Sequence, residues 1–190
     1  RTIAFTYKAD GHRETVTDSR GVTHYEYDTQ GQLLSRTEPD NTKISYTYDR
    51  QNQRVKTVTS LSGTTSYEYN GLAQLTKVTG PDGKATTYTY DAIGNLSTTV
   101  RPNGTTQLYR YDALNRPVYL ENKDRNGQIL SSYAYTYDKV GNKLSVEEFG
   151  GRKVNYTYDT LNRLTKEVIV DPVNGNRTIE YVYDVVGNRL

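Results

Sequence analysis

The sequence predicts an all-β fold in which tandem antiparallel β-hairpins form one continuous curved sheet. Three observations support this prediction: a Tyr-x-Tyr-Asp motif recurs along the chain, Gly or Asn follows it at a fixed distance, and other turn residues lie about ten residues before each Asp. Between the two kinds of turn, Thr- and Tyr-rich stretches such as 86–90 alternate with a period of two, as β-strands do.

The Tyr-x-Tyr-Asp motif defines the repeat. Eight copies, one of which ends in Asn, contain 16 of the 19 tyrosines, and successive copies begin 21, 21, 21, 21, 26, 21 and 25 residues apart. Phe5-Thr6-Tyr7, ahead of Gly11, is interpreted as a ninth copy that has diverged. A fixed period of this length indicates a repeat architecture. The eight copies are Tyr25–Asp28, Tyr46–Asp49, Tyr67–Asn70, Tyr88–Asp91, Tyr109–Asp112, Tyr135–Asp138, Tyr156–Asp159 and Tyr181–Asp184.

The residue three positions after each Asp (or Asn70) indicates a hairpin turn. Seven of the eight residues there are Gly or Asn, which best tolerate a positive φ. We expect the Asp side chain to cap a type I turn and the Gly or Asn to adopt the left-handed conformation after it. The exception is Ala73, where the pair Asn70-Gly71 predicts that the turn has shifted. The eight residues are Gly31, Asn52, Ala73, Gly94, Asn115, Gly141, Asn162 and Gly187.

A second set of turns separates the repeats. Each repeat is therefore predicted to contain a strand, an Asp turn, a return strand and a linking turn. Since residues i and i+2 of a strand share a face, the two Tyr of each motif lie on one face. We expect their rings to stack from hairpin to hairpin, and the opposite face to carry Thr, Lys, Glu and Arg in solvent. The linking turns include 39–41, 62–63, 81–83, 102–104 and 150–151.

Two repeats are longer than the others. Their extra residues lie around 123–127 and 171–175, before Asp138 and Asp184. We expect each insertion to lengthen its hairpin on the linking-turn side only, so that both hairpins project from one rim of the sheet. The insertions either adjust the shape of the sheet or contact a partner, and loop insertions of this kind cost little free energy.

Composition limits the core and the partners. Hydrophobic residues make up 34% of the chain, and Cys, Met and Trp are absent. We expect burial to depend on tyrosine, which combines a large ring with a polar tip. The net charge is +2 with mixed signs throughout, so we expect no nucleic-acid partner. No apolar run is long enough to span a membrane. The chain begins at Arg1 and ends at Leu190 inside a repeat, so we expect a piece of a longer protein.

Eight or nine hairpins give about 17 antiparallel strands, and open sheets of that width twist, curl or close. A hollow, spiralling wall is the simplest geometry that satisfies these constraints. A β-propeller is the alternative, because two repeats have the length of one four-stranded blade. We see no alternation between odd and even repeats, which argues against the propeller. Both ends of the sheet would expose edge strands, so we expect this segment to be poorly stable alone.

Catalytic chemistry has little support in the sequence. A carboxylate that recurs at every turn is more simply a turn cap than a catalytic acid, because catalytic sites are single constellations. The spacing of the acids does not match a calcium loop, and His12 and His24 belong to no ligand cluster. We therefore predict no catalytic, cofactor-binding or metal-binding residue, no cofactor, and no enzymatic activity.

The motif Tyr-x-Tyr-Asp-x-x-Gly-x-Leu, seen most clearly in Asp91–Leu96 and Asp159–Leu164, resembles the YD repeat of the Rhs family. This family includes bacterial Rhs polymorphic toxins, the C component of Tc toxins, wall-associated proteins and teneurins. The resemblance covers residues 1–190 as one YD-repeat array. It implies a segment of a hollow β-shell, whose partners are the rest of the shell and an enclosed C-terminal toxin or cargo, in a secreted or cell-surface bacterial protein.

The same resemblance leaves a second function open, an extracellular module that binds carbohydrate or protein at a cell surface. Toxins of the family often cleave themselves at a motif that contains Asp-Pro. Here Asp171-Pro172 lies in an ordinary turn, another repeat follows it, and the surrounding residues do not match. We therefore assign no cleavage site.

Overall fold

The computed structural model describes residues 2–190, which contain β-strands and turns and no helix. The chain divides into two compact units, an N-terminal unit, Arg1–Thr87, and a C-terminal unit, Tyr88–Leu190. The boundary falls inside β9, Ala85–Tyr90. The other strands of the N-terminal unit are β1 Ala4–Tyr7, β2 Arg13–Asp18, β3 Gly21–Tyr27, β4 Leu33–Thr37, β5 Lys43–Tyr48, β6 Arg54–Thr59, β7 Gly63–Tyr69 and β8 Leu75–Thr79.

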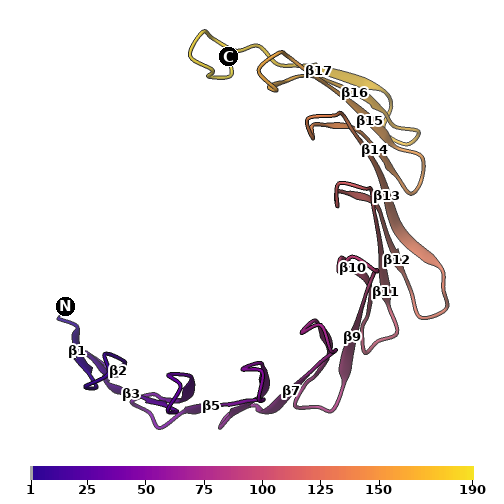
Figure 1. The fold of residues 1–190 in the computed structure, drawn as a ribbon. Helices are drawn as coiled ribbons and strands as arrows, with labels where there is room; N and C mark the ends of the chain where they lie inside the picture. Colours follow the sequence, from indigo (N-terminus) through magenta and orange to yellow (C-terminus); the bar gives the residue numbers. More distant parts are fainter. Residues whose placement is uncertain (1) are drawn as a thin grey trace. The chain divides into compact units, whose positions relative to one another are not determined.

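The C-terminal unit continues the same pattern. Every strand of either unit pairs antiparallel with the strand that follows it in the chain, and backbone hydrogen bonds join all 17 strands into one sheet. Figure 1 shows this order. The predicted all-β sheet of tandem hairpins is confirmed. The strands are β10 Leu96–Val100, β11 Thr106–Tyr111, β12 Pro117–Lys123, β13 Ile129–Tyr137, β14 Lys143–Glu148, β15 Lys153–Tyr158, β16 Leu164–Val170 and β17 Arg177–Glu180.

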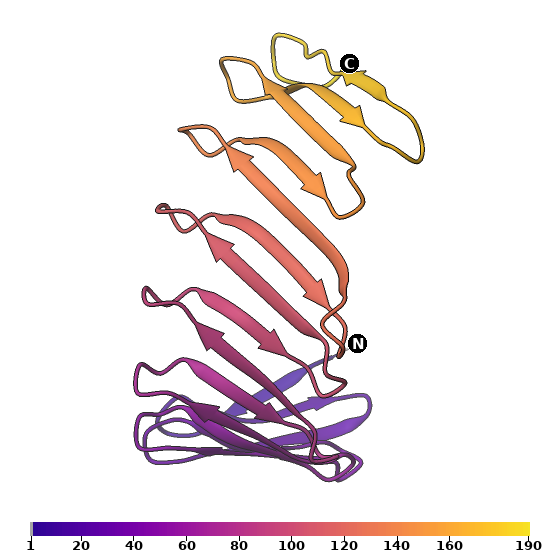
Figure 2. The ribbon, with the colours of Figure 1, turned by 90° about the vertical axis from the view of Figure 1, so that its right-hand side faces the viewer.

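Two kinds of turn alternate along the sheet, as predicted. In the C-terminal unit the Asp turns lie along one rim and the linking turns along the other, at the left and right of Figure 2. The ladder register shifts by one residue beside six of the Asp turns, for example between Thr47 and Tyr48 of β5. Such a shift is a β-bulge, which accommodates the left-handed residue that ends the turn.

The longer repeats extend the sheet on the linking-turn side, which confirms that prediction. β12 has seven residues and β13 has nine, whereas β10 has five. The ladder between β12 and β13 includes pairs from Tyr119–Ala134 to Lys123–Ile129. β16 has seven residues and leads into the turn at 171–176. The Asp turns keep their length, so the insertions leave the Asp rim unchanged.

The core is thin and lies on the face that carries the motif tyrosines, which we call the tyrosine face. In the C-terminal unit a row of paired residues, Val146, Val154 and Ile169, forms the buried cluster. Tyr133, Tyr135, Tyr156 and Ile179 pack against it. In the N-terminal unit the pairs equivalent to Val146–Val154 are Arg36–Ile44, Thr57–Thr65 and Val78–Thr86.

The prediction of stacked tyrosine ladders is wrong. Among residues 2–190 the stacked tyrosine pairs, Tyr109–Tyr111 and Tyr133–Tyr135, each lie along a single strand, β11 and β13, with ring centroids 6.4 Å apart. The motif occupies alternate strands, so rings of neighbouring hairpins are about 9.6 Å apart, beyond stacking distance.

Cations fill the space between these rings. The Arg54 guanidinium lies 5.8 Å from the Tyr46 ring and 4.9 Å from the Tyr67 ring. Arg13 lies in the same way between Phe5 and Tyr25. Arginine is therefore also a residue of the tyrosine face, which corrects its assignment to the opposite face. Each such contact contributes about 0.5–1 kcal/mol at a partly exposed site.

Candidate functional site

The Asp turn is the most regular feature of the molecule. In the first copy, the Asp28 N–H donates to the Gln32 carbonyl at 3.0 Å and the Gly31 N–H donates to the Asp28 carbonyl at 3.2 Å. Oδ1 of Asp28 accepts the N–H groups of Gln30 and Gln32 at 2.8 and 2.9 Å. The same two side-chain bonds form at all eight motifs, with Asn70 in place of Asp in the third. The motif carboxylates are therefore turn caps, as predicted.

The residue three positions after the Asp is left-handed throughout. Its φ is 64° at Asn52, 59° at Asn115 and 94° at Gly94. Ala73 also has a φ of 63°, and its N–H donates to the Asn70 carbonyl at 3.0 Å. The predicted shift of this turn is therefore wrong. The hydrogen bonds of the Asn70 cap hold the turn in place and force Ala73 into a conformation that costs about 1–2 kcal/mol for an L-residue.

The cap contacts keep the carboxylates ionised. The Arg116 N–H and guanidinium lower the pKa of Asp112, and those of Arg163 do the same for the pKa of Asp159. At Asp138 desolvation acts in the opposite direction, but hydrogen bonds from Asn142 outweigh it and the pKa is lowered. These groups accept hydrogen bonds from the backbone and hold no proton to transfer near neutral pH.

In six of the motifs the second tyrosine joins its hairpin to the preceding one. The Tyr48 hydroxyl donates to the Leu33 carbonyl at 3.0 Å, and the Tyr158 hydroxyl donates to the Lys143 carbonyl at 2.8 Å. Burial raises the pKa of both tyrosines. Sequence reasoning missed this contact, although the second motif position is always Tyr and never Phe. The same bond also forms at Tyr69, Tyr111, Tyr137 and Tyr183.

In the C-terminal unit the residue four positions after the Asp joins neighbouring Asp turns. The Asn95 amide donates to Asn115 Oδ1 at 3.1 Å, and the Asn142 amide donates to Asn162 Oδ1 at 2.8 Å. Arg116 donates to the Asp138 carbonyl at 2.8 Å. Arg116 also lies 4.8 Å from the Tyr137 ring.

These contacts follow an alternation that the sequence interpretation did not recognise. From Asp91 onward, the third and fourth residues after the Asp are Gly-Asn, Asn-Arg, Gly-Asn, Asn-Arg and Gly-Asn. The first and second asparagines at the fourth position each bond to an asparagine at the third position of the next turn, so the two turn types must alternate. The statement that odd and even repeats do not alternate is therefore wrong for this unit.

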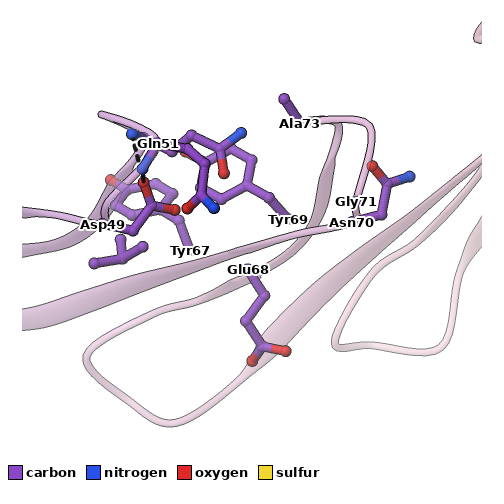
Figure 3. Close-up of a pocket in the computed structure, with 10 residues that line it drawn as sticks. Asp49, Gln51, Tyr67, Glu68, Tyr69, Asn70, Gly71 and Ala73 are labelled. Atoms are coloured by element: carbon purple, nitrogen blue, oxygen red, sulfur yellow. Dashed lines mark hydrogen bonds between the residues drawn. The ribbon is translucent and has the colours of Figure 1, made fainter.

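Two equivalent grooves lie between Asp turns of the N-terminal unit. One has a volume of about 540 Å³ and is lined by Asp49, Gln51, Gln53, Tyr67 and Tyr69, among others. Figure 3 shows both tyrosines on the side of β7 that faces Asp49 and Gln51, while Glu68 points away. The other groove, of about 430 Å³, is lined by the corresponding residues of the preceding repeat, which include Asp28, Gln30, Gln32, Tyr46 and Tyr48.

The remaining sequence candidates lie in structural positions. The His12 ring lies 4.8 Å from the Tyr27 ring and beside Asp10, and His24 is exposed on β3. The Asp171 carboxylate accepts hydrogen bonds from Val173 and Asn174 in its turn. Residues 2–190 contain no group of three or more His, Asp or Glu side chains that could hold a metal ion. In the same residues no helix is long and apolar enough to cross a membrane.

Several of the solved structures that share this fold contain Tc toxin proteins. The structure of TcdB2-TccC3-TEV has a TM-score of 0.78 at 18% identity over 99% of this chain, and TcdB2-TccC3 without the hypervariable C-terminal region has 0.78 at 16% over 96%. The Tc holotoxin pore of Photorhabdus luminescens has 0.66 at 18% over 98%. The chain spans only 12–13% of the length of these proteins.

Comparison with family profiles agrees with the fold. The RHS repeat profile matches residues 7–43 and 27–65. A comparison with curated proteins gives no match. The teneurin YD-shell profile matches residues 53–190, most of the chain. With its repeated Asp turns and tyrosine contacts, the chain therefore belongs to the teneurin YD-shell family.

Proposed function

We propose that this chain is a non-catalytic segment of a shell that encloses a C-terminal toxin or other cargo of a secreted bacterial protein. The observation that supports this most strongly is the tyrosine–carbonyl bond, which joins one hairpin to the next in the same way in repeat after repeat. Because each repeat makes the same contact with the next, a sheet of such repeats can be lengthened without any change to that contact. The recurring polar groups of the motif serve the turns and that joint, so they leave no reactive side chain for catalysis.

The partners in this proposal are the rest of the shell and the domain inside it. The family match and the fold shared with TcdB2-TccC3 structures support a shell, and one of those structures is described as lacking a hypervariable C-terminal region. A container needs a continuous wall, and paired strands leave backbone groups unpaired only at the two edges of a sheet.

Limited proteolysis of the full-length parent, with mass spectrometry of the products, tests the proposal. A C-terminal segment that survives while the shell is native, and is digested once the shell is unfolded, is the expected result. If the C-terminal segment is cut at once while the repeats resist, the container function is wrong.

A second candidate function is carbohydrate binding at a cell surface, and the two equivalent grooves favour it. Each combines tyrosine rings with carboxylate and amide groups, which suit stacking and hydrogen bonding to a sugar. Calorimetric titration of the chain with cell-wall glycans, compared with the Gln51→Ala variant, tests this function. Binding that Gln51→Ala weakens would support it, and no heat at millimolar glycan would exclude it. Leu61→Ala, in a linking turn, is the matched control.

A further inference from the structure

Two arginines of the C-terminal unit fill the space between neighbouring Asp turns. Each is the residue four positions after a motif Asp, which we call the fourth residue, and each covers the second tyrosine ring of the next motif. The Arg116 guanidinium lies 4.8 Å from the Tyr137 ring, and the Arg163 guanidinium lies 4.7 Å from the Tyr183 ring. These arginines show which chemical group the space between two Asp turns accepts.

Three groups hold the Arg116 guanidinium. Its Nε donates to Oδ2 of Asp112 at 2.7 Å, and its Nη1 donates to the Asp138 carbonyl at 2.8 Å. The face of the Tyr137 ring attracts the cation and supplies the third contact. A guanidinium suits this set better than an ammonium group, because its N–H donors lie in one fixed plane that also stacks on aromatic rings. A carboxylate, a carbonyl and a ring therefore form a guanidinium site between these turns.

The larger groove of the N-terminal unit presents the same three groups without the cation. Its fourth residue is Gln53, which is shorter than arginine and neutral. Asp49 supplies the carboxylate, Tyr69 the ring and Asn70 the carbonyl, and all of them line the groove of about 540 Å³. The third residue of this turn is Asn52, and it is also Asn in both arginine turns. The groove is therefore the equivalent of an arginine site from which the arginine is missing.

The carboxylate and the ring of this groove are available to a ligand. Oδ1 of Asp49 caps its turn by accepting the N–H groups of Gln51 and Gln53. Among residues 2–190 no hydrogen bond reaches Oδ2 of Asp49, the atom that corresponds to the arginine-bonded oxygen of Asp112. The neighbouring Arg54 stacks on the first tyrosines of two motifs and leaves the second tyrosine uncovered. The groove therefore carries a negative charge with an open aromatic face.

The preceding groove repeats this arrangement. It has a volume of about 430 Å³, and its lining includes the carboxylate of Asp28, the fourth residue Gln32 and the ring of Tyr48. Tyr48 and Tyr69 lie on β5 and β7, two strands apart, which is about 9.6 Å. In a polyproline II segment, side chains three residues apart share a face and are about 9.3 Å apart. Such a segment can place one arginine in each groove.

We propose that the two grooves bind arginine side chains of an extended segment of a partner polypeptide. In each groove the guanidinium donates to the open carboxylate oxygen and to the backbone carbonyl of the next motif, and it stacks on the second tyrosine, as Arg116 does. A sugar can stack on the same ring, but it lacks the positive charge that complements the carboxylate. This inference does not rest on the shell function, and it competes with carbohydrate binding for the same grooves.

Titration of the intact chain with N-acetyl-arginine amide, followed by nuclear magnetic resonance, tests the larger groove. The probe should shift the backbone amide signals of Gln53 and Tyr69, and it should bind more tightly than N-acetyl-lysine amide. Asp49→Asn keeps the turn cap, as Asn70 shows, and should weaken binding at least about tenfold, the effect of losing a charge-assisted hydrogen bond. Asp124→Asn changes an identical cap in a linking turn of the other unit, so it is the matched control and should leave binding unchanged.

Two further measurements sharpen the test. Gln53→Arg should fill the larger groove from within, as Arg116 fills its own site, and abolish binding of the probe there. The peptide acetyl-Arg-Pro-Pro-Arg-amide should bind at least about tenfold more tightly than the single arginine, because it engages both grooves. The proposal is overturned by any of four results: no shift at about 50 mM probe, equal weakening by Asp49→Asn and Asp124→Asn, a peptide no tighter than the single arginine, or a cell-wall glycan that occupies the grooves when arginine does not.

Discussion

The two units share one strand pattern but differ in the side chains that pack on the tyrosine face. Beside the motif tyrosines, the C-terminal unit places Val146, Val154 and Ile169, which are at most 7% exposed. One equivalent pair of positions in the N-terminal unit is Thr57 and Thr65, whereas a cation lies over the first motif ring in both units, Arg54 over Tyr46 and Lys143 over Tyr135. The same backbone therefore accepts aliphatic or threonine side chains at these positions, and the hairpin pattern does not depend on a conventional core.

The Asp turns differ in the same way. In the C-terminal unit, Asn and Arg side chains join one turn to the next. In the N-terminal unit the same position is Gln32, Gln53 and Gln74, and open grooves lie between the turns. We expect the C-terminal unit to be the more stable of the two, since it has both the apolar cluster and the additional contacts.

The largest expected effect is on the apolar cluster. Ile169→Ala removes a side chain that is 2% exposed and should lower the free energy of unfolding by about 3 kcal/mol, because it leaves a cavity. Thr65→Ala, at the tyrosine face of the N-terminal unit, should cost less than about 1 kcal/mol. Urea unfolding followed by circular dichroism measures both, and equal losses would contradict the difference between the units.

The tyrosine–carbonyl bond should contribute equally to the stability of the two units. Tyr48→Phe and Tyr158→Phe each leave a carbonyl without its donor, at Leu33 and Lys143, and should each cost about 1–2 kcal/mol. The same urea experiment applies. A loss confined to Tyr158→Phe would mean that the joint matters only where the aliphatic cluster supports it.

A smaller effect, of opposite sign, is expected at Ala73. Ala73→Gly relieves a left-handed alanine with a φ of 63° and should stabilise the N-terminal unit by about 1 kcal/mol. Ala113→Gly is the control, because Ala113 is not left-handed and the change should destabilise by roughly 0.4–1 kcal/mol through the unfolded chain. Stabilisation by both variants would show that flexibility, not φ, decides the outcome.

The smallest expected effect is on the stability of the protein at low pH. The folded pKa of Asp112 lies below its usual value of 3.8. Its stabilising contribution is therefore present above pH 3.8 and is lost as the pH falls through the folded pKa. Asp112→Asn keeps an acceptor, as Asn70 does, and removes the titration. In a circular dichroism titration the variant should be slightly less stable than the parent near neutral pH, because it lacks the charged contact with Arg116, and the two should converge as the pH falls through the folded pKa. A difference in stability that stays the same from neutral pH into acid would argue against this cause.

The fold was predictable because its signals are local. Asp28 and Gly31 specify a turn through their own side-chain chemistry, and the period of two specifies the strands. The contacts between repeats were not predictable in the same way. The Tyr158 hydroxyl reaches Lys143 only because of the register between hairpins, and the spacing of two strands keeps the rings apart. Ala73 adopts its φ because surrounding hydrogen bonds outweigh its own preference, which no local propensity reveals.

The linking turns have a consequence for how such a chain can change over time. Repeats of 25 or 26 residues differ from those of 21 only at the linking-turn rim, where β12 and β13 simply gain rungs. Mutation and recombination can therefore vary the length of one rim while the joints at the other stay intact. A foreign epitope grafted after Asn126 would exploit this freedom if it keeps Arg125, which packs closely against Gly104 of the preceding linking turn, in place.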